Sequence, residues 1–295
     1  MRIVSFFICT RGKSTFLLKT LKSIKKLKTD YLIDVNVIFN SNLKLSFEES
    51  FKKLITKKFK INFVRENKKG IPSVRNKSLK LIKKKKNIRC VGLIDDDCVI
   101  HRDWLNEMIK VYNITKADII TGPQIPINKN VYEHILQREE SHLSKIKWAA
   151  TNNVFFNSKI IKKIDINFSN SLNEIGGSDQ LFFLQLFKKG FKIIWNDKAK
   201  VFEKRNISGS NLDWFIKRNL RFGISTKIIY TKSYGLFTGL FMTFFKIFYE
   251  LLISIFYLFI SFYKPKINIL KSIMHLARFC GIIIGLLGFR LNKYI

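Results

Sequence analysis

The chain has 295 residues, and 54 Lys and Arg against 21 Asp and Glu give it a formal net charge of +33. Its hydrophobic fraction of 47% excludes a wholly disordered chain, and its four cysteines are too few for a disulfide scaffold. They form no CxxC pair, which argues against a zinc site and favours a reducing compartment. At roughly 150 residues per domain, the length predicts two domains, or one larger α/β domain with an appendage.

The basic residues are mostly lysines, and they are spread along the chain instead of forming one patch. A run of four lysines at 83–86 falls where a helix is expected to end. Cations at a helix C-terminus interact favourably with the helix dipole. The sequence has neither zinc-finger spacing nor an RRM-type aromatic motif. We therefore expect no nucleic-acid partner, although a basic surface also suits anionic lipid, at about 1 kcal/mol per well-placed cation.

The first third of the chain alternates between short apolar runs and amphipathic stretches. Strands are predicted over residues 3–9, 35–39, 61–64 and 91–94, and helices from residue 14 and over 47–55 and 72–82. This alternation predicts an α/β fold, with βαβ units in a mainly parallel sheet flanked by helices. Ligands in such sheets bind beyond the carboxyl ends of the strands. No small-residue cleavage site follows the first run, so we interpret it as a buried strand and not a signal peptide.

The pattern is less regular after residue 102. It predicts helices over residues 103–112 and 133–147 and from 179, strands over 154–156, 192–195 and 200–202, and a loop over 169–177. No repeat of fixed period is present.

The composition changes after about residue 230. Residues 234–263 carry only two charges, Lys246 and Glu250, whose i,i+4 spacing allows them to pair on one helical face. The following segment carries its charges at helical spacing between apolar residues, which predicts an amphipathic helix lying in a membrane interface. The charges of this stripe are Lys264, Lys271, His275 and Arg278.

The positions of the lysines also indicate how the C-terminal segment is arranged at a membrane. A spanning hairpin with its catalytic part in the cytoplasm would place Lys264, Lys266 and Lys271 outside, against the positive-inside tendency. We therefore favour peripheral, in-plane attachment to the cytoplasmic face of the cell membrane. A short transmembrane hairpin is the next alternative, and an apolar oligomer interface of a soluble protein is the third.

Three adjacent carboxylates, Asp95, Asp96 and Asp97, follow the fourth predicted strand. They repel one another unless a cation lies among them, and a hard divalent metal that bridges a pyrophosphate is the natural occupant. The alternative is an acidic loop that caps the next helix, a role that Asp103 fills better.

A second motif combines Gly176 and Gly177 with Ser178 and Asp179. The glycines permit a sharp loop, and Asp179 would begin the next helix, where its carboxylate stays ionised and can take a proton from an acceptor hydroxyl. The alternative is a simple N-cap. Arginine suits phosphate or sugar recognition, although a solvated helix surface is its commoner place. The candidates are Arg75, Arg218 and Arg221.

Together these strings resemble, in order and spacing over residues 1–225, the family 2 glycosyltransferases of the GT-A fold. The matching segments are 3–11, 70–76, 94–97 with 103–105, 151–154, 176–179 and 218–223. The resemblance implies a GT-A domain over residues 1–228, followed by membrane-associated helices over 229–295. Within that domain, residues 1–122 would bind the nucleotide-sugar, and residues 123–228 would form the acceptor or catalytic region.

The resemblance also implies a reaction and its residues. The reaction is inverting transfer of a sugar from a nucleotide-sugar donor to a saccharide or lipid-linked acceptor, in cell-surface polysaccharide or glycan assembly. Asp179 resembles the general base, and Asp97 resembles a ligand of Mg²⁺ or Mn²⁺ on the diphosphate, with Glu203 as a further metal ligand. The implied donor-binding residues are Thr10, Arg11, Asn40, Arg75, Asp95 and Asp96. The implied acceptor or phosphate contacts are Asn153, Gly177, Ser178, Arg218 and Arg221.

The chain departs from the family pattern at four positions. Ser178 stands where the family usually has Glu, Leu181 where many members have another acid, and Asn40 where an Asp commonly reads the base. Glu203 stands where a metal-binding His is sometimes found. The first two departures motivate an alternative function, a non-catalytic membrane-associated nucleotide-sugar-binding protein.

Overall fold

The structure is a computed structural model that describes residues 3–10, 14–40, 49–85, 88–127, 130–204 and 211–289. The chain divides into two compact units, which are described separately. Unit 1 comprises Met1–Ile127, Arg138–Phe168 and Phe182–Lys204, and unit 2 comprises Asn128–Gln137, Ser169–Leu181 and Arg205–Ile295.

Unit 1 contains the strands and most of the shorter helices. Its strands are β1 (Ile3–Thr10), β2 (Leu32–Phe39), β3 (Phe59–Arg65), β4 (Ile88–Asp95), β5 (Cys98–Ile100), β6 (Ile119–Thr121), β7 (Gln124–Pro126), β8 (Val154–Asn157), β9 (Ile193–Trp195) and β10 (Val201–Glu203). Its helices are α1 (Ser14–Lys25), α2 (Glu49–Lys52), α3 (Ile71–Lys84), α4 (Trp104–Thr115), α6 (Ser158–Lys163) and most of α7 (Ser178–Lys188), which begins in unit 2.

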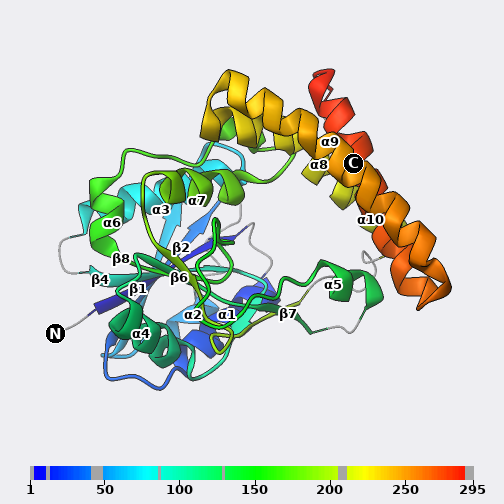
Figure 1. Ribbon diagram of the computed structural model, residues 1–295. Helices are drawn as coiled ribbons and strands as arrows, with labels where there is room; N and C mark the ends of the chain where they lie inside the picture. Colours follow the sequence, from blue (N-terminus) through cyan, green and yellow to red (C-terminus); the bar gives the residue numbers. More distant parts are fainter. Residues whose placement is uncertain are drawn as a thin grey trace. The chain divides into compact units, whose positions relative to one another are not determined.

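Seven strands form the central sheet, in the order β3-β2-β1-β4-β8-β6-β9 (Figure 1). All neighbouring pairs are parallel except those of β8, which runs antiparallel to both β4 and β6. The predicted α/β fold, with a mainly parallel sheet flanked by helices, is confirmed. The carboxyl ends of β1, β2 and β4 therefore meet at one edge of the sheet, where Thr10, Asn40 and Asp95 of the predicted donor-binding set lie.

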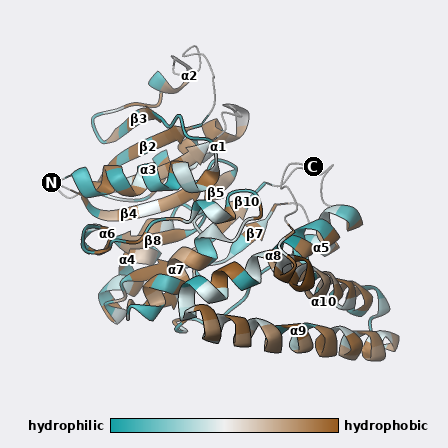
Figure 2. Cartoon of the chain, turned by 90° about the horizontal axis from the view of Figure 1, so that it is seen from above, coloured by the Kyte–Doolittle hydropathy of each residue, from teal (hydrophilic) through white to brown (hydrophobic). Residues whose placement is uncertain are grey.

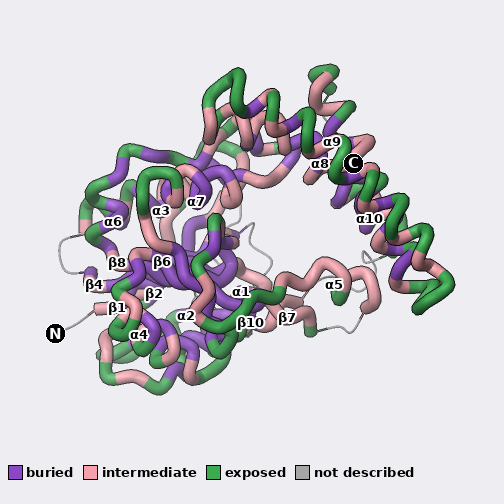
Figure 3. Tube along the Cα trace, in the orientation of Figure 1, coloured by how far each residue is buried: buried purple, intermediate pink, exposed green. Residues whose placement is uncertain are grey.

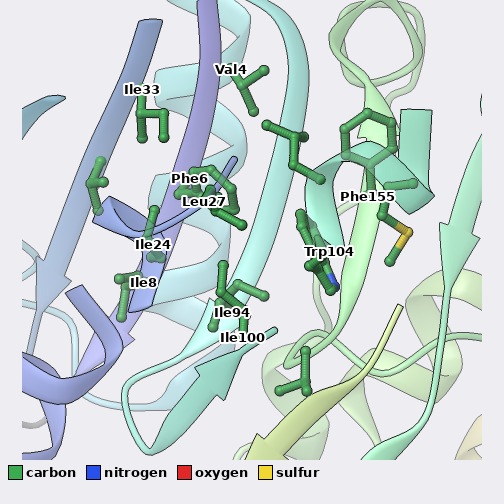
Figure 4. Packing of buried hydrophobic residues seen from close by; sticks show 14 of the residues in the cluster. Val4, Phe6, Ile8, Ile24, Leu27, Ile33, Ile94, Ile100, Trp104 and Phe155 are labelled. Atoms are coloured by element: carbon green, nitrogen blue, oxygen red, sulfur yellow. The ribbon is translucent and has the colours of Figure 1, made fainter. Parts of the chain in front are cut away.

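Both faces of the sheet are buried, which explains why its strands are nearly continuous apolar runs. Val4, Phe6 and Ile8 of β1 pack toward α1 and α4 (Figure 4), whereas Phe7 packs with residues of α3, α6 and α7. Trp104, at the start of α4, lies with its ring centroid 5.7 Å from that of Phe6. This crowding leaves no room for a side chain at position 92 of β4.

A partly buried polar network spans β1, β2 and β3. Asp34 accepts hydrogen bonds from Ser5 Oγ at 3.0 Å, Asn36 Nδ2 at 3.1 Å and Asn62 Nδ2 at 2.6 Å. Lys85 Nζ bonds to Asp34 and, at 2.8 Å, to Asn36 Oδ1. Burial raises the pKa of Asp34, but the hydrogen bonds from Lys85, Asn36 and Ser5 lower it by more, so the pKa lies below its usual value.

Asp34→Asn is expected to reduce the free energy of unfolding by about 2 kcal/mol at pH 7, since it removes charge-assisted hydrogen bonds. The folded-state pKa of Asp34 lies below the unfolded value of about 3.9. Its stabilisation is therefore present above that pH and is lost as the pH falls through the folded-state pKa. Urea unfolding at neutral and acid pH, with exposed Asp30→Asn as control, measures the difference. An equal deficit at both pH values would contradict the prediction.

The helix predicted over residues 133–147 is wrong. Helix α5 spans only Val131–Leu136, and the following segment turns at Leu143 and forms a single antiparallel bridge to β9, between Lys145 and Ile194. Ile146 N donates to Ile193 O at 3.0 Å, and Arg138 stacks over the Trp148 ring at 4.3 Å. These tertiary contacts override the helical periodicity of the segment. The helix predicted over 47–55 is shorter as well, because α2 ends at Lys52, while residues 47 and 48 lie outside the described residues.

Unit 2 contains α5 and three long helices, α8 (Leu212–Tyr234), α9 (Leu236–Phe259) and α10 (Pro265–Leu286). Leu236–Phe262 and Pro265–Leu286, of 27 and 22 residues, are long and apolar enough to cross a membrane by length and composition. Only 17% of the most apolar stretch of Leu236–Phe262 is buried. A helix in the core of a soluble protein is mostly buried, so this segment differs from one.

Helix α9 has an inverted distribution of side chains. Its buried residues are small or polar, and its exposed residues are apolar or aromatic apart from Thr238 (Figures 2 and 3). The buried residues are Gly239, Thr243, Glu250 and Ser254. A water-soluble helix shows the opposite pattern, so α9 suits an apolar environment.

The polar residues of α9 pair with those of α10. Glu250 lies 2.9 Å from Lys246 Nζ, as the i,i+4 spacing predicts, and 2.6 Å from His275 Nδ1. Ser254 Oγ donates to Ser272 O at 3.0 Å. The two helices thus form an antiparallel hairpin with a polar seam.

The charged stripe of the predicted amphipathic helix, α10, is only partly exposed. His275 is buried against Glu250, and Arg278 Nε donates to Asn219 Oδ1 of α8 at 2.9 Å. Lys264, at the tip of the hairpin, is exposed as expected. His275 thus has a carboxylate partner inside the helix layer, whereas Arg278 bonds only to the neutral amide of Asn219.

Candidate functional site

The carboxylates of the acidic motif lie at the carboxyl end of β4. Asp95 is its last residue, and a tight turn leads to β5, which pairs with β10 so that Glu203 lies opposite Cys98. Lys204 N also donates to Asp97 O at 3.0 Å. Two segments distant in sequence thus place Glu203 beside the acidic turn, and the metal-ligand role of Asp97 and Glu203 stays a prediction.

The pKa of Asp97 is shifted strongly by its surroundings. Burial raises the pKa of its carboxyl to about 7, and the charges of Asp95, Glu203 and Asp96 add to the rise. Cys98 Sγ donates a hydrogen bond to Asp97 Oδ1 at 3.5 Å, which opposes it. The site accumulates negative charge that a bound cation would relieve.

Asp96 is held by hydroxyl groups from the first strand and helix. Thr10 Oγ1, at the end of β1, donates to Asp96 Oδ2 at 2.5 Å, and Thr20 Oγ1 of α1 donates to Asp96 O at 2.9 Å. Thr20 was not among the predicted site residues, although a polar residue on the buried face of an amphipathic helix is a signal that it has a partner. Arg11, the neighbour of Thr10, lies outside the described residues.

Arg75 lies on α3 near the carboxyl end of β1. Burial raises the pKa of the Cys9 thiol to about 12, the charge of Arg75 opposes this rise, and the charge of Asp95 adds to it. The Arg75 guanidinium carbon lies 5.6 Å from the centroid of the Phe168 ring. The structure therefore brings Arg75, Asp95, Asp96, Asp97 and Thr10 to one edge of the sheet, as predicted.

Asn40 follows β2 and is occupied within the protein. Its Nδ2 donates to Glu66 O and Lys68 O, both at 2.7 Å, and its Oδ1 accepts from Gly70 N at 2.9 Å. Gly70 has a φ of 111°, which favours glycine. Asn40 therefore shapes the loop before α3, and its predicted role in donor binding stays a prediction.

Asn153 is fully buried, and both the oxygen and the nitrogen of its side-chain amide form hydrogen bonds. Its Oδ1 accepts from Trp104 Nε1 at 2.8 Å, and its Nδ2 donates to Pro123 O at 3.0 Å and Ala199 O at 2.8 Å. It connects α4 to the segments before β7 and β10. This bonding gives Asn153 a positioning role in place of the predicted acceptor contact.

No group of three His, Cys, Asp or Glu residues able to hold a metal ion occurs in the stretches of the chain that the structure describes. Mg²⁺ sites in nucleotide-dependent enzymes commonly use one or two carboxylates together with substrate phosphates. Asp97 and Glu203, which repel each other, fit that smaller donor set.

The second predicted set of residues lies in unit 2. Gly176 and Gly177 have φ values of 92° and 83°, which explains the paired glycines. A Cβ at position 177 would lie 3.2 Å from Ser225 Oγ of α8, so the loop packs closely on this helix. Ser178 is buried, and Asp179 is half-buried in the first turn of α7, where its Oδ1 accepts from Gln180 N at 2.9 Å.

Arg218 and Arg221 project from α8. The guanidinium carbon of Arg218 lies 5.4 Å from the Trp214 ring centroid and 5.5 Å from that of Phe222. Burial lowers the pKa of Arg221. Both side chains are half-buried, which differs from the solvated surface that is common for arginine.

Two family models match this chain. Residues 5–173 match Glycosyl transferase family 2, and residues 90–289 match Glycosyl transferase family group 2. The succinoglycan biosynthesis protein ExoM of Rhizobium meliloti (strain 1021) is 24% identical over 154 residues, which cover 50% of this chain and 50% of ExoM. The match thus spans about half the length of that relative.

Solved structures share the fold. The mannosyltransferase PcManGT from Pyrobaculum calidifontis, in complex with GDP-Man and Mn²⁺, has a TM-score of 0.62 at 14% identity, covering 97% of this chain and 88% of PcManGT. TarS 1-349 of S. aureus in complex with UDP has a TM-score of 0.54 at 13% identity, covering 99% of this chain and 93% of that chain. These likenesses agree with the GT-A fold expected from the sequence.

Proposed function

Because the chain belongs to glycosyl transferase family 2, we propose that it is an inverting glycosyltransferase that uses a nucleotide-sugar donor. The observation that carries the proposal is the crowding of Asp95, Asp96, Asp97 and Glu203 at the carboxyl end of β4. An α/β sheet places its ligand at this edge. The name of ExoM supports a role in polysaccharide assembly, with a saccharide or lipid-linked acceptor.

The proposed chemistry assigns one task to each group. Asp179 takes the proton of the acceptor hydroxyl, whose oxygen attacks the anomeric carbon. The bond from that carbon to the diphosphate oxygen breaks, the diphosphate leaves with the electron pair, and the configuration inverts. Arg75 contacts the nucleotide, while Arg218 and Arg221 contact phosphate or acceptor.

Asp97 and Glu203 are the proposed ligands of Mg²⁺ or Mn²⁺. Such an ion, when bound, supplies positive charge that stabilises the leaving diphosphate. Thr10 and Thr20 hold the acidic turn in place, through Asp96, for this task.

Nucleotide release from a panel of UDP-, GDP- and dTDP-sugars, with and without Mn²⁺, tests the proposal. Detergent-purified protein should release nucleotide from one donor class when a membrane extract supplies acceptor. Donor binding without release under these conditions would identify the alternative, a sugar-nucleotide binder that has lost catalysis through Ser178 and Leu181. If the protein neither binds a donor nor releases nucleotide from one, the proposal is overturned.

We further propose that unit 2 attaches the enzyme to the cytoplasmic face of the membrane, with α9 in the plane of the leaflet. The three long helices differ in what they expose. Helix α9 exposes aromatic and aliphatic side chains, whereas α8 exposes Asp213 and Lys217. This asymmetry suits a layer with one helix in lipid and another in water.

The double change Phe241→Asp and Phe245→Asp is expected to move the protein from the membrane fraction to the soluble fraction. The two side chains are 63% and 56% exposed on α9, and burial of each in lipid contributes about 2 kcal/mol. Ile114→Asp, at an equally exposed apolar position of α4, serves as control and should stay with the membranes. Unchanged fractionation of the double variant would contradict attachment through α9.

A further inference from the structure

Arg278 of α10 has unused hydrogen-bonding capacity. Its Nε donates to Asn219 Oδ1 at 2.9 Å, and its guanidinium carbon lies 5.8 Å from the Phe222 ring centroid. Within residues 211–289 and the other described ranges, its terminal amino groups meet no acceptor. The side chain is only half-buried, so these donors remain accessible. An arginine in an apolar helix layer is costly unless its planar fork binds an anion.

The long helices of unit 2 provide no carboxylate for Arg278. Helices α8, α9 and α10 contain nine Lys and Arg but only two acids, Asp213 and Glu250. Asp213 pairs with Lys217 at 3.1 Å, and Glu250 pairs with Lys246 and His275. Glu250 therefore acts on Arg278 only through its charge, and the layer carries an excess of cations.

A second guanidinium lies at the same aromatic ring. Arg218 of α8 approaches Phe222 to 5.5 Å, on the same ring that Arg278 approaches from α10. The two helices are held close by glycines, since a Cβ at Gly281 would lie 2.2 Å from Leu220 O. The charge of Arg218 adds to the positive potential beside this ring, which attracts an oxyanion to Arg278.

We propose that Arg278, in the positive potential to which Arg218 contributes, binds the phosphate group of a membrane lipid. The ring of Phe222 and the apolar surface of α9 in the same unit suit the acyl part of such a molecule, which free phosphate lacks. This inference rests on the proposed membrane attachment but not on sugar transfer. It gives Arg278 a ligand, whereas the sequence predicted only that Arg278 belongs to the charged stripe of an amphipathic interfacial helix.

Vesicle binding by the full chain tests the proposal. Wild-type protein should bind vesicles of phosphatidylcholine with phosphatidic acid about tenfold more tightly than vesicles of phosphatidylcholine alone. Arg278→Gln should remove most of this preference and leave binding to phosphatidylcholine unchanged. Lys217→Gln removes an equal charge from an exposed position of α8 and should keep the preference.

Each other outcome overturns the proposal. An undiminished preference in Arg278→Gln would exclude the site, and an equal loss in Lys217→Gln would show attraction by surface charge alone. Complete displacement from the vesicles by inorganic phosphate would assign the site to the free anion. If Arg278→Gln does not fold, Arg278→Lys preserves the charge without the fork, and a wild-type preference in that variant would contradict bidentate binding. Failure to bind either vesicle would instead reject membrane attachment, while nucleotide release reports on catalysis separately.

Discussion

Asp179→Asn is expected to lower sugar transfer about 10³-fold and to leave donor affinity within about twofold of the wild type. The amide has nearly the shape of the carboxylate and can still accept the hydrogen bond from Gln180 N, so the first turn of α7 is preserved. It cannot take a proton from the acceptor hydroxyl. Loss should therefore occur in kcat, with the donor Kd unchanged.

The control for this prediction is Glu174→Gln, which neutralises an exposed acid a few residues earlier in the same loop. It should retain full turnover. Turnover measured on the donor identified by the nucleotide panel, and donor Kd measured by calorimetry, separate the two effects. Full activity in Asp179→Asn would show that Asp179 is not the general base. Loss of donor binding would show that Asp179 acts in donor binding instead.

Asp97→Asn is expected to reduce activity at least about 10²-fold and, at the same time, to stabilise the metal-free protein. Burial and the charges of Asp95, Glu203 and Asp96 raise the pKa of this carboxyl to about 7. The unfolded chain ionises the same group near pH 3.9. Ionised Asp97 therefore destabilises the fold, fully above pH 7 and not at all below the unfolded-state pKa.

The stability gain from Asp97→Asn should thus appear as the pH rises from 4 through 7 and amount to about 1–2 kcal/mol at pH 8, after a discount for partial exposure. Thermal unfolding across this pH range measures it, with Asp165→Asn as an exposed control. Mn²⁺ should raise the Tm of the wild type but not that of the variant. A destabilised variant, or one that Mn²⁺ stabilises equally, would contradict the prediction.

The sheet was predictable because its strands are short apolar runs separated by amphipathic helices. The direction of β8 was not, since Val154 and its neighbours have the same apolar character in a parallel or an antiparallel strand. The helix predicted over 133–147 failed because Arg138 finds Trp148 and Trp195 only in the folded protein. The hydrophobic periodicity of a sequence gives no information about such tertiary contacts.

The acidic portion of the site was predictable because Asp95, Asp96 and Asp97 are consecutive. The roles of Asn40 and Asn153 were not, because their partners come from distant segments of the chain. Spacing alone placed both at the correct edge of the sheet. It left open whether each side chain faces a ligand or bonds within the protein.

The polar seam of the α9–α10 hairpin has a consequence for folding kinetics. Its contacts join residues 25, 18 and 8 positions apart, at Glu250 and His275, Ser254 and Ser272, and Asn268 and Ile260. The sheet of unit 1 instead needs β1 to find β4, with Ile3 paired to Ile88. Short loops close quickly and low contact order favours fast folding. We expect the hairpin to form early, and the assembly of the sheet to be the slow step that leaves apolar strands exposed to aggregation.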